Sequence, residues 1–456
     1  SLSLSLWALV VFSRSLANVF FEWSKCSAAK KRDPKERTQN SSLFFFCLFF
    51  VCCLMFRVSR KKKNFGCTPN TFDTKKYSFL YPPLCIGRRR GEEEDTQTDT
   101  ERETMSSKTK KVRVGVNGFG RIGRLAFRLA YENPNLEFVH VNEGVGAGES
   151  SAYLANWDSV HGKWNGHEME FDEETNTMRV DGGKMILTYS QKMSPGEVDW
   201  KSMDIDMVLE CSGAFLTREK LQAYFDAGVK KVVVSAPVKD KENPVLNIVY
   251  GVNHSDYDKN ADHIVTAASC TTNCLAPVIQ VILKKVGIVR GSITTIHNVT
   301  NTQTIVDAPN SKKSDLRRAR SGLVNLAPTS TGSATAIALI FPELKGKLDG
   351  LAVRVPLING SLTDIVLDLP RDVTTDEING YLKEASENEL KDILGFETQP
   401  LVSTDYINDT RSSIIDALST KVVDKRHLKI YAWYDNEYGY SARMADIANM
   451  VAESIM

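Results

Sequence analysis

The first group in this sequence with an evident chemistry is a cysteine placed just ahead of an apolar helix. Cys270 stands within Ser269–Cys274 (SCTTNC), and the apolar residues of Leu275–Val286 predict a buried helix whose first turn begins near this cysteine. The unpaired amides at a helix start favour a thiolate over a thiol. His297, on a later element, could take the thiol proton and then act on a substrate oxygen. The alternative is a cysteine that only fills apolar space.

A second motif is a glycine-rich turn between a strand and a helix. The apolar strand Val112–Asn117 leads into Gly118, Gly120 and Gly123, spaced as GxGxxG. These glycines allow a tight turn, a close approach of the main chain to a pyrophosphate, and packing of the helix on the strand. A second strand ends at Glu143, about where an acidic residue would bind a ribose hydroxyl. The unit predicts dinucleotide binding; the alternative is a glycine-rich turn in another α/β protein.

The order of the remaining elements predicts an α/β protein with two kinds of sheet. Strands alternate with helices over residues 105–269, which is typical of a doubly wound parallel sheet. Over residues 270–432 the strands are longer and the helices fewer, which favours an α+β catalytic domain with a mixed or antiparallel sheet. A final helix within residues 433–456 is apolar on one side, and we expect it to return to the first domain.

Residues 1–104 differ from the rest of the chain. They begin with alternating serine and leucine, and an apolar run of 14 residues at 43–56 is followed by basic and acidic runs. We expect that translation begins at Met105 and that the preceding part is read-through of untranslated sequence. The alternative is a targeting segment, with 43–56 as a signal-peptide core or anchor. We assign this region no fold and no catalytic role.

Composition excludes several classes of protein. The 57 basic and 56 acidic residues nearly balance, which argues against general binding to nucleic acid or anionic membrane. Only Cys211, Cys270 and Cys274 follow residue 104, which does not suggest a disulfide scaffold or a zinc site. We therefore expect no metal and a reducing, cytoplasmic location, or an organelle if residues 1–104 are a targeting segment.

Cationic and hydroxyl groups follow the cysteine helix. Arg318 lies in a basic cluster within the long polar segment 300–320, and Thr331 and Gly332 belong to a hydroxyl-rich turn that opens a helix. Such a turn, with its free amides, is a natural anion site. Arg354 lies inside a strand, an unusual position for a charge unless it points into a cleft. Each feature alone has an ordinary structural explanation, but together with the thiol they favour a phosphorylated aldehyde as substrate.

Short segments distributed over residues 105–456 carry a resemblance to the phosphorylating glyceraldehyde-3-phosphate dehydrogenases. The matching segments are Asn117–Arg124, Asp158–Gly162, Ser235–Pro237, Ser269–Pro277, Arg317–Arg320, Thr329–Ala334, Val353–Pro356 and Trp433–Ser441. The resemblance implies a Rossmann-type NAD-binding domain and a catalytic domain. It also implies that Cys270 attacks the aldehyde with help from His297, that hydride passes to NAD, and that inorganic phosphate releases an acyl phosphate from the thioester.

The resemblance further assigns contacts and an assembly. Beyond the three glycines, the residues that match cofactor contacts are Arg121, Ile122, Glu143, Ser235 and Asn436. The residues that match substrate or phosphate contacts are Ser269, Thr271, Thr300, Arg318, Thr331, Gly332 and Arg354. Members of this family are usually homotetramers.

Three departures from the family pattern leave the exact substrate open. Glu143 replaces the usual aspartate, Leu357–Gly360 replaces a segment with a Thr-Pro pair, and Asn298-Val299 replaces a small residue followed by tyrosine. The glutamate and the leucine-containing segment resemble side branches that oxidise erythrose 4-phosphate or use arsenate in place of phosphate. Two other hypotheses are a non-catalytic NAD-binding scaffold and a semialdehyde dehydrogenase whose substrate carries a carboxylate.

Overall fold

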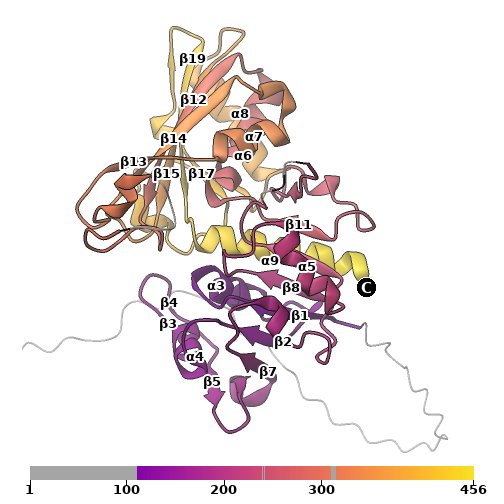
Figure 1. The fold of residues 1–456 in the computed structure, drawn as a ribbon. Coiled ribbons are helices and arrows are strands. Elements are labelled where there is room, and N and C mark those ends of the chain that lie inside the picture. The colour runs from indigo at the N-terminus through magenta and orange to yellow at the C-terminus, as the bar shows by residue number, and fades with distance from the viewer. Residues whose placement is uncertain (1–109, 239, 241, 310–314) are drawn as a thin grey trace, which may run out of the picture. The chain divides into compact units, whose positions relative to one another are not determined.

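The computed structural model describes residues 110–238, 240, 242–309 and 315–456. The described residues all belong to one compact unit (Figure 1), and everything below concerns this unit. The interpretation of residues 1–104 as read-through or targeting sequence lies outside the described residues. Among the described residues, no helix has the length and apolar character needed to cross a membrane.

The first sheet of this unit carries the glycine turn. Within the described residues it has nine strands in the order β10-β11-β9-β8-β1-β2-β7-β6-β5. Its parallel strands are β1 (Val112–Asn117), β2 (Leu136–Asn142), β7 (Met185–Ser190), β8 (Met207–Glu210), β9 (Lys231–Val234), β10 (Leu246–Asn247) and β11 (Ile264–Thr266). Its helices are α3 (Arg121–Ala130), α4 (Gly148–Asn156) and α5 (Arg218–Asp226). The predicted doubly wound parallel sheet is confirmed for this part.

One edge of this sheet differs from the sequence-based prediction. Strands β5 (Met169–Asp172) and β6 (Thr177–Val180) pair antiparallel with each other, and β6 pairs antiparallel with β7. The connections between these strands are only a few residues long, whereas parallel strands need a crossover of a dozen or more. The sheet is therefore mixed at this edge. A small two-stranded ladder, β3 (Trp157–Asp158) and β4 (Gly162–Lys163), lies between α4 and β5 in the chain.

The second sheet is mixed, as the sequence predicts. Its order is β13-β14-β12-β15-β19-β17-β16, with β18 paired to β19. The strands are β12 (Arg290–Asn298), β13 (Ala327–Ser330), β14 (Leu348–Val355), β15 (Ser361–Asp368), β16 (Leu394–Glu397), β17 (Ser413–Asp416), β18 (Lys421–Val423) and β19 (His427–Tyr434). Helices α6 (Cys270–Lys285), α7 (Ser333–Ile340) and α8 (Thr375–Glu387) pack on one face of it (Figure 1).

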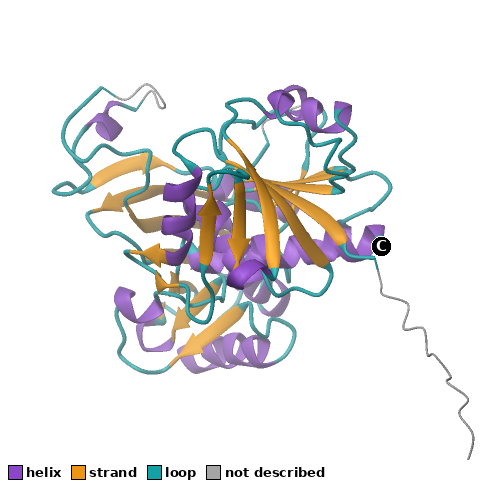
Figure 2. Cartoon of the chain, turned by 90° about the horizontal axis from the view of Figure 1, so that it is seen from below, coloured by secondary structure: helices purple, strands orange, loops and turns teal. Residues whose placement is uncertain are grey.

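The last helix joins the two sheets. Helix α9 (Tyr438–Ile455) follows β19 and runs across the middle of the unit in both views (Figures 1 and 2). Its side chains Met444, Ile447 and Val451 are fully buried in the core that also contains Phe127 of α3. The chain thus leaves the second sheet and packs back on the first, so that the residues around the β19–α9 connection lie between the two.

Sheet register brings the charged residues of the second sheet to one place. Strands β12 and β14 are parallel neighbours, and His297 is the direct register partner of Arg354. Helix α6 starts shortly after the carboxyl end of β11, the edge where open α/β sheets bind their ligands. The thiol, the imidazole and the guanidinium therefore come from three separate elements.

Candidate active site

Cys270 and His297 are in contact. The Cys270 Sγ lies 3.5 Å from His297 Nε2. Cys270 is the first residue of α6, and the Ser269 side chain caps this helix by accepting a hydrogen bond from the Thr272 amide at 3.2 Å. The pairing of cysteine and histidine that the sequence predicts is present, although no element of local sequence links the two.

A cleft opens over this pair. It has a volume of about 440 Å³, which lies within the range of small-molecule sites. Its lining combines residues of both sheets: Arg121, Ile122, Cys211, Ser235, Ser269, Cys270, His297, Thr300, Thr302, Arg354, Asn436 and Tyr440 are among them. Of the predicted contacts, Ile122, Ser235, Ser269, Thr300, Arg354 and Asn436 thus meet around the thiol.

The electrostatics of the pair differ from what a helix start alone suggests. Burial raises the pKa of the Cys270 thiol, while the positive charge of Arg354 and the amides at the helix start lower it. Burial and the same Arg354 charge lower the pKa of His297 to about 3. The expected preference for thiolate from the helix amides is therefore opposed by desolvation in the free protein, and Arg354 supplies the nearest full positive charge.

Arg354 points into the cleft, as predicted. Its Nη1 lies 2.6 Å from His297 Nδ1 and 3.1 Å from the carbonyl oxygen of Asn298. Its Nε is buried and has no hydrogen-bond partner. A buried guanidinium with a donor left over is suited to bind an anion that enters the cleft.

The glycine turn has the shape that a dinucleotide requires. Gly118 has φ +89°, and a Cβ there would lie 2.4 Å from the Ser212 amide nitrogen. A Cβ on Gly123 would lie 2.0 Å from the Gly118 carbonyl oxygen, whereas one on Gly120 would meet nothing within 4 Å. Open space over the middle glycine, at the start of α3, is where a pyrophosphate would approach the main chain.

Glu143 lies beside this turn. Its carboxylate accepts hydrogen bonds from the Phe119 amide at 2.7 Å and from the Val145 amide at 3.0 Å. The side chain therefore ties the carboxyl end of β2 to the glycine turn. A carboxylate at the end of the second strand can accept a hydrogen bond from a ribose hydroxyl, so the residues present suit NAD.

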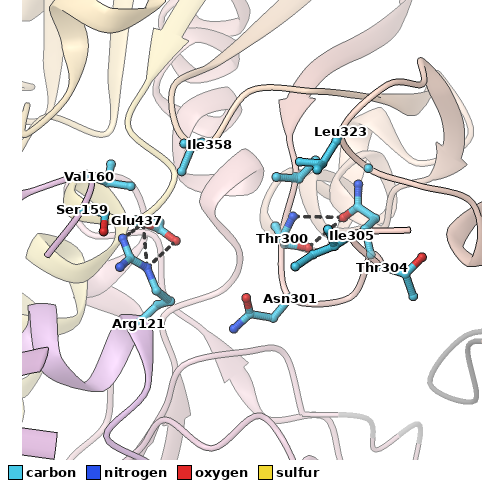
Figure 3. A pocket seen from close by; sticks show the side chains of 13 residues that line it. Arg121, Ser159, Val160, Thr300, Asn301, Thr304, Ile305, Leu323, Ile358 and Glu437 are labelled. Atoms are coloured by element: carbon cyan, nitrogen blue, oxygen red, sulfur yellow. Dashed lines mark hydrogen bonds and ion pairs between the residues drawn. The ribbon is translucent and has the colours of Figure 1, made fainter. Parts of the chain in front are cut away.

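Arg121 is placed differently from the other cofactor candidates. Its guanidinium forms ion pairs with Asp158 and Glu437, and His161 Nε2 lies 3.0 Å from a Glu437 carboxylate oxygen. Figure 3 shows Arg121 and Glu437 joined on one wall of an adjoining pocket. The guanidinium is engaged in these ion pairs, and Arg121 also lines the cleft over Cys270. Sequence reasoning gave no individual role to Asp158, His161 or Glu437, which connect Arg121 of the first sheet's α3 to the start of α9.

The predicted phosphate contacts divide into two groups. Thr300 Oγ1 lies 2.9 Å from Thr302 Oγ1, which accepts a hydrogen bond from Arg318 Nη1 at 2.9 Å. The two threonines line the cleft together with His297, whereas Arg318 contacts Thr302 and is not among the lining residues. Thr331 and Gly332 lie at the start of α7, where Thr331 Oγ1 contacts Ser333 Oγ at 3.0 Å. They are not among the residues that line the cleft.

Thr271 lies behind the cleft. It is buried, and its hydroxyl lies 3.0 Å from the Tyr434 hydroxyl, which also lies 2.7 Å from Thr295 Oγ1. Through its side chain Thr271 thus fixes the start of α6 to the second sheet. Tyr434 was not predicted, because only the pairing of distant strands shows that its hydroxyl supports the cysteine turn.

The fold and site together define a class of protein, an oxidoreductase in which a dinucleotide-binding glycine turn and a cysteine–histidine pair lie near one cleft. Residues 112–218 match the family model "Glyceraldehyde 3-phosphate dehydrogenase, NAD binding domain", and residues 269–436 match the C-terminal domain of the same family. The described residues hold no group of three or more His, Cys, Asp or Glu side chains that could bind a metal ion.

Curated relatives agree with the family models. Glyceraldehyde-3-phosphate dehydrogenase 3 of Nostoc sp. is 56% identical over 346 residues, which are 76% of this chain and 99% of the relative. Glyceraldehyde-3-phosphate dehydrogenase of Geobacillus stearothermophilus is 47% identical over 341 residues, which are 75% of this chain and 98% of the relative. The chain belongs to the glyceraldehyde-3-phosphate dehydrogenase family, and its cofactor is NAD.

Proposed function

We propose that this protein oxidises glyceraldehyde 3-phosphate, with NAD and inorganic phosphate, to an acyl phosphate. The observation that carries the proposal is the cluster of Cys270, His297 and Arg354 at the base of one cleft, next to the glycine turn of the first sheet. A thiol nucleophile, a proton acceptor and an anion-binding cation are the groups that this reaction needs.

In the proposed mechanism Cys270 attacks the aldehyde carbon and forms a hemithioacetal. When bound, NAD is the acceptor for the hydride from the hemithioacetal carbon. His297 Nε2, which lies 3.5 Å from Sγ, is placed to take the hydroxyl proton of the hemithioacetal. Loss of this proton from oxygen, together with loss of the carbon-bound hydrogen as hydride, leaves a thioester on Cys270. Arg354, with Thr300, Thr302 and Arg318, would bind the phosphate groups. Attack of inorganic phosphate on the thioester carbon then releases the acyl phosphate and restores the thiol.

The test is NADH formation with purified full-length protein under four conditions. Glyceraldehyde 3-phosphate with phosphate should give sustained turnover. Erythrose 4-phosphate and arsenate test the two side branches suggested by Glu143 and by the Leu357–Gly360 segment. A carboxylated semialdehyde tests the remaining enzyme class. NAD binding without turnover on any aldehyde would contradict the proposal and favour a scaffold.

We further propose a homotetramer. Support comes from apolar side chains in the described part of the connection between β12 and β13, which are open to solvent in a single chain. Ile305 is 72% exposed, Leu316 83% and Val324 77%. An interface between subunits would cover these side chains and remove them from water. Light scattering coupled to size-exclusion chromatography checks this, and a monodisperse monomer would contradict it.

We also propose a cytoplasmic location. Cys211, Cys270 and Cys274 are free in the described part of the chain, which suits a reducing compartment. Imaging of the native protein checks this, and an organellar signal would instead support a targeting role for residues 1–104.

A further inference from the structure

Two of the departures from the family pattern meet in space. Asn298 Nδ2 donates a hydrogen bond to the carbonyl oxygen of Ile358 at 2.6 Å, and the Val299 amide donates to the carbonyl oxygen of Leu357 at 3.0 Å. Asn298 ends β12, whereas Leu357 and Ile358 belong to the connection between β14 and β15. The two departures are therefore parts of one local structure, although Asn298 and Ile358 are 60 residues apart in the sequence.

Ser361 connects this local structure to a predicted cofactor contact. It is the first residue of β15, and its side chain is buried. Its Oγ accepts a hydrogen bond from the Asn298 main-chain amide at 3.3 Å. The same Oγ lies 3.3 Å from Asn298 Oδ1 and 3.0 Å from Asn436 Oδ1. One hydroxyl group thus contacts both Asn298 and Asn436.

The available donors and acceptors determine how these amides are oriented. The Ile358 carbonyl oxygen can only accept, so Asn298 turns Nδ2 toward it and Oδ1 toward Ser361. The Asn298 main-chain N–H can only donate, so it occupies one lone pair of Ser361 Oγ and directs the hydroxyl hydrogen toward the two side-chain oxygens. The shorter contact is the one to Asn436 Oδ1, and the hydroxyl donates chiefly there.

This arrangement leaves a donor for the cleft. Asn436 lines the cleft, and its Nδ2, on the other branch of the planar amide, has no hydrogen-bond partner among the described residues. In the proposed reaction the hydride leaves a carbon bound to Cys270, so the nicotinamide ring would occupy the part of the cleft next to this residue. The ring carries a carboxamide, whose oxygen accepts hydrogen bonds. An amide whose rotation is already restricted loses less entropy when it binds that oxygen.

We infer that Ser361, held by Asn298, is a positioning residue for NAD, because it fixes the Asn436 amide with Nδ2 toward the carboxamide oxygen of the nicotinamide. Ser361 is not among the residues that line the cleft, so it acts through Asn436. Without the hydroxyl, the Asn436 amide would be free to turn and present either its oxygen or its nitrogen. The inference rests on the proposed function for one point, the position of the ring next to Cys270.

The experiment is calorimetric titration of the full-length protein with NAD and with ADP-ribose, which lacks the nicotinamide ring. Ser361→Ala should weaken NAD binding by about 2- to 10-fold, the usual contribution of one hydrogen bond. The affinity for ADP-ribose should be unchanged, whereas a general loosening of the fold would weaken both ligands. Asn298→Ala removes the bond to Ile358 and keeps the main-chain amide, so it should show the same selective loss to a smaller extent.

Ser441→Ala is the matched control. Ser441 is a buried serine of α9, and its hydroxyl has no hydrogen-bond partner. The change removes the same oxygen atom close to Asn436 in the chain without touching the Asn298–Ser361 contact. This variant should bind NAD and ADP-ribose as the wild type does.

A second measurement needs no variant. The 3-acetylpyridine analogue of NAD keeps the carbonyl oxygen of the carboxamide and has a methyl group in place of its nitrogen. If Asn436 Nδ2 faces the ring, the wild type should bind this analogue about as tightly as NAD. If Oδ1 faced the ring instead, it would lose the hydrogen bond from the carboxamide, and the analogue would bind about 2- to 10-fold more weakly.

Three results would overturn the inference. They are an unchanged NAD affinity in Ser361→Ala, an equal loss for NAD and ADP-ribose in that variant, and weak binding of the acetylpyridine analogue to the wild type. An Asn298→Ala protein that binds NAD normally would refute the part assigned to Asn298. Because no turnover is measured, these results are separate from the aldehyde assay. A selective loss can occur in a protein that oxidises no aldehyde, and an active enzyme can lose both ligands equally.

Discussion

The glycines of the first turn should separate cofactor binding from folding when each is replaced by alanine. Gly120 has φ −73° and ψ −156°, and a Cβ added there meets nothing within 4 Å. Gly123 has no such room, because its Cβ would lie 2.0 Å from the Gly118 carbonyl oxygen. The two changes add the same methyl group at positions three residues apart. Gly120→Ala should weaken NAD binding without lowering stability, whereas Gly123→Ala should lower stability.

The expected magnitudes follow from these surroundings. Gly120→Ala fits the native backbone and restricts the unfolded chain, so its stability should be unchanged or higher by up to about 1 kcal/mol. Its methyl group occupies the space where a pyrophosphate would approach the start of α3. Loss of one hydrogen bond to a charged group costs about 1.5–3 kcal/mol. NAD should therefore bind about 10- to 100-fold more weakly.

Gly123→Ala should act on the fold instead. The clash is with main-chain oxygen, which no rotamer change can relieve, so α3 must move away from β1. Overpacking of this kind costs about 1–3 kcal/mol or more. We expect a clear drop in the thermal midpoint and in soluble yield, with NAD binding impaired as a consequence.

Thermal unfolding and calorimetric titration with NAD measure both properties for each variant. Gly380→Ala is a matched control, because it adds a methyl to a helix remote from the turn and meets nothing within 4 Å. The reasoning is refuted if Gly120→Ala binds NAD as tightly as the wild type, or if Gly123→Ala unfolds at the wild-type temperature.

Further predictions concern four single side chains. Cys270→Ser should abolish aldehyde oxidation while NAD still binds, and substantial turnover of this variant would exclude Cys270 as nucleophile. His297→Asn should lower kcat by about 10²- to 10⁴-fold, the usual contribution of a general base. Steady-state assays with NAD titration check both predictions. Glu143→Ala should weaken NAD binding and reduce the preference for NAD over NADP. It should also loosen the glycine turn, because the Glu143 carboxylate accepts a hydrogen bond from the Phe119 amide at 2.7 Å. An unchanged ratio of kcat/KM for the two cofactors would contradict the assignment. Burial lowers the pKa of His140 from 6.5 to about 4, so its unfolded state binds more protons and stability should fall as the pH drops from 6.5 toward 4. This one group can account for up to about 3 kcal/mol. A His140→Gln protein should lose less stability than the wild type over that window in denaturant titrations, and equal losses would speak against the assignment.

The sequence alone determined those features that depend on neighbouring residues. The spacing of Gly118, Gly120 and Gly123 predicts the turn because the steric limits on each glycine are local. Apolar runs predict the longer strands of both sheets, such as β1, β12, β15 and β19, for the same reason. Cys270 could be predicted as a candidate nucleophile because the adjacent residues predict the helix that follows it. The antiparallel edge formed by β5 and β6 was missed, since these short strands carry a weaker pattern.

Only the tertiary structure decided how distant groups act on one another. Register between β12 and β14 places Arg354 against His297, and no local pattern encodes the pairing of two strands some 50 residues apart. Burial then changes the chemistry of both candidate catalytic groups: desolvation opposes the thiolate at Cys270 and lowers the pKa of His297. The guanidinium of Arg121, a candidate cofactor contact by sequence, is engaged by Asp158 and Glu437. Contacts between remote segments and their loss of water set these properties, and both arise only when the chain has folded.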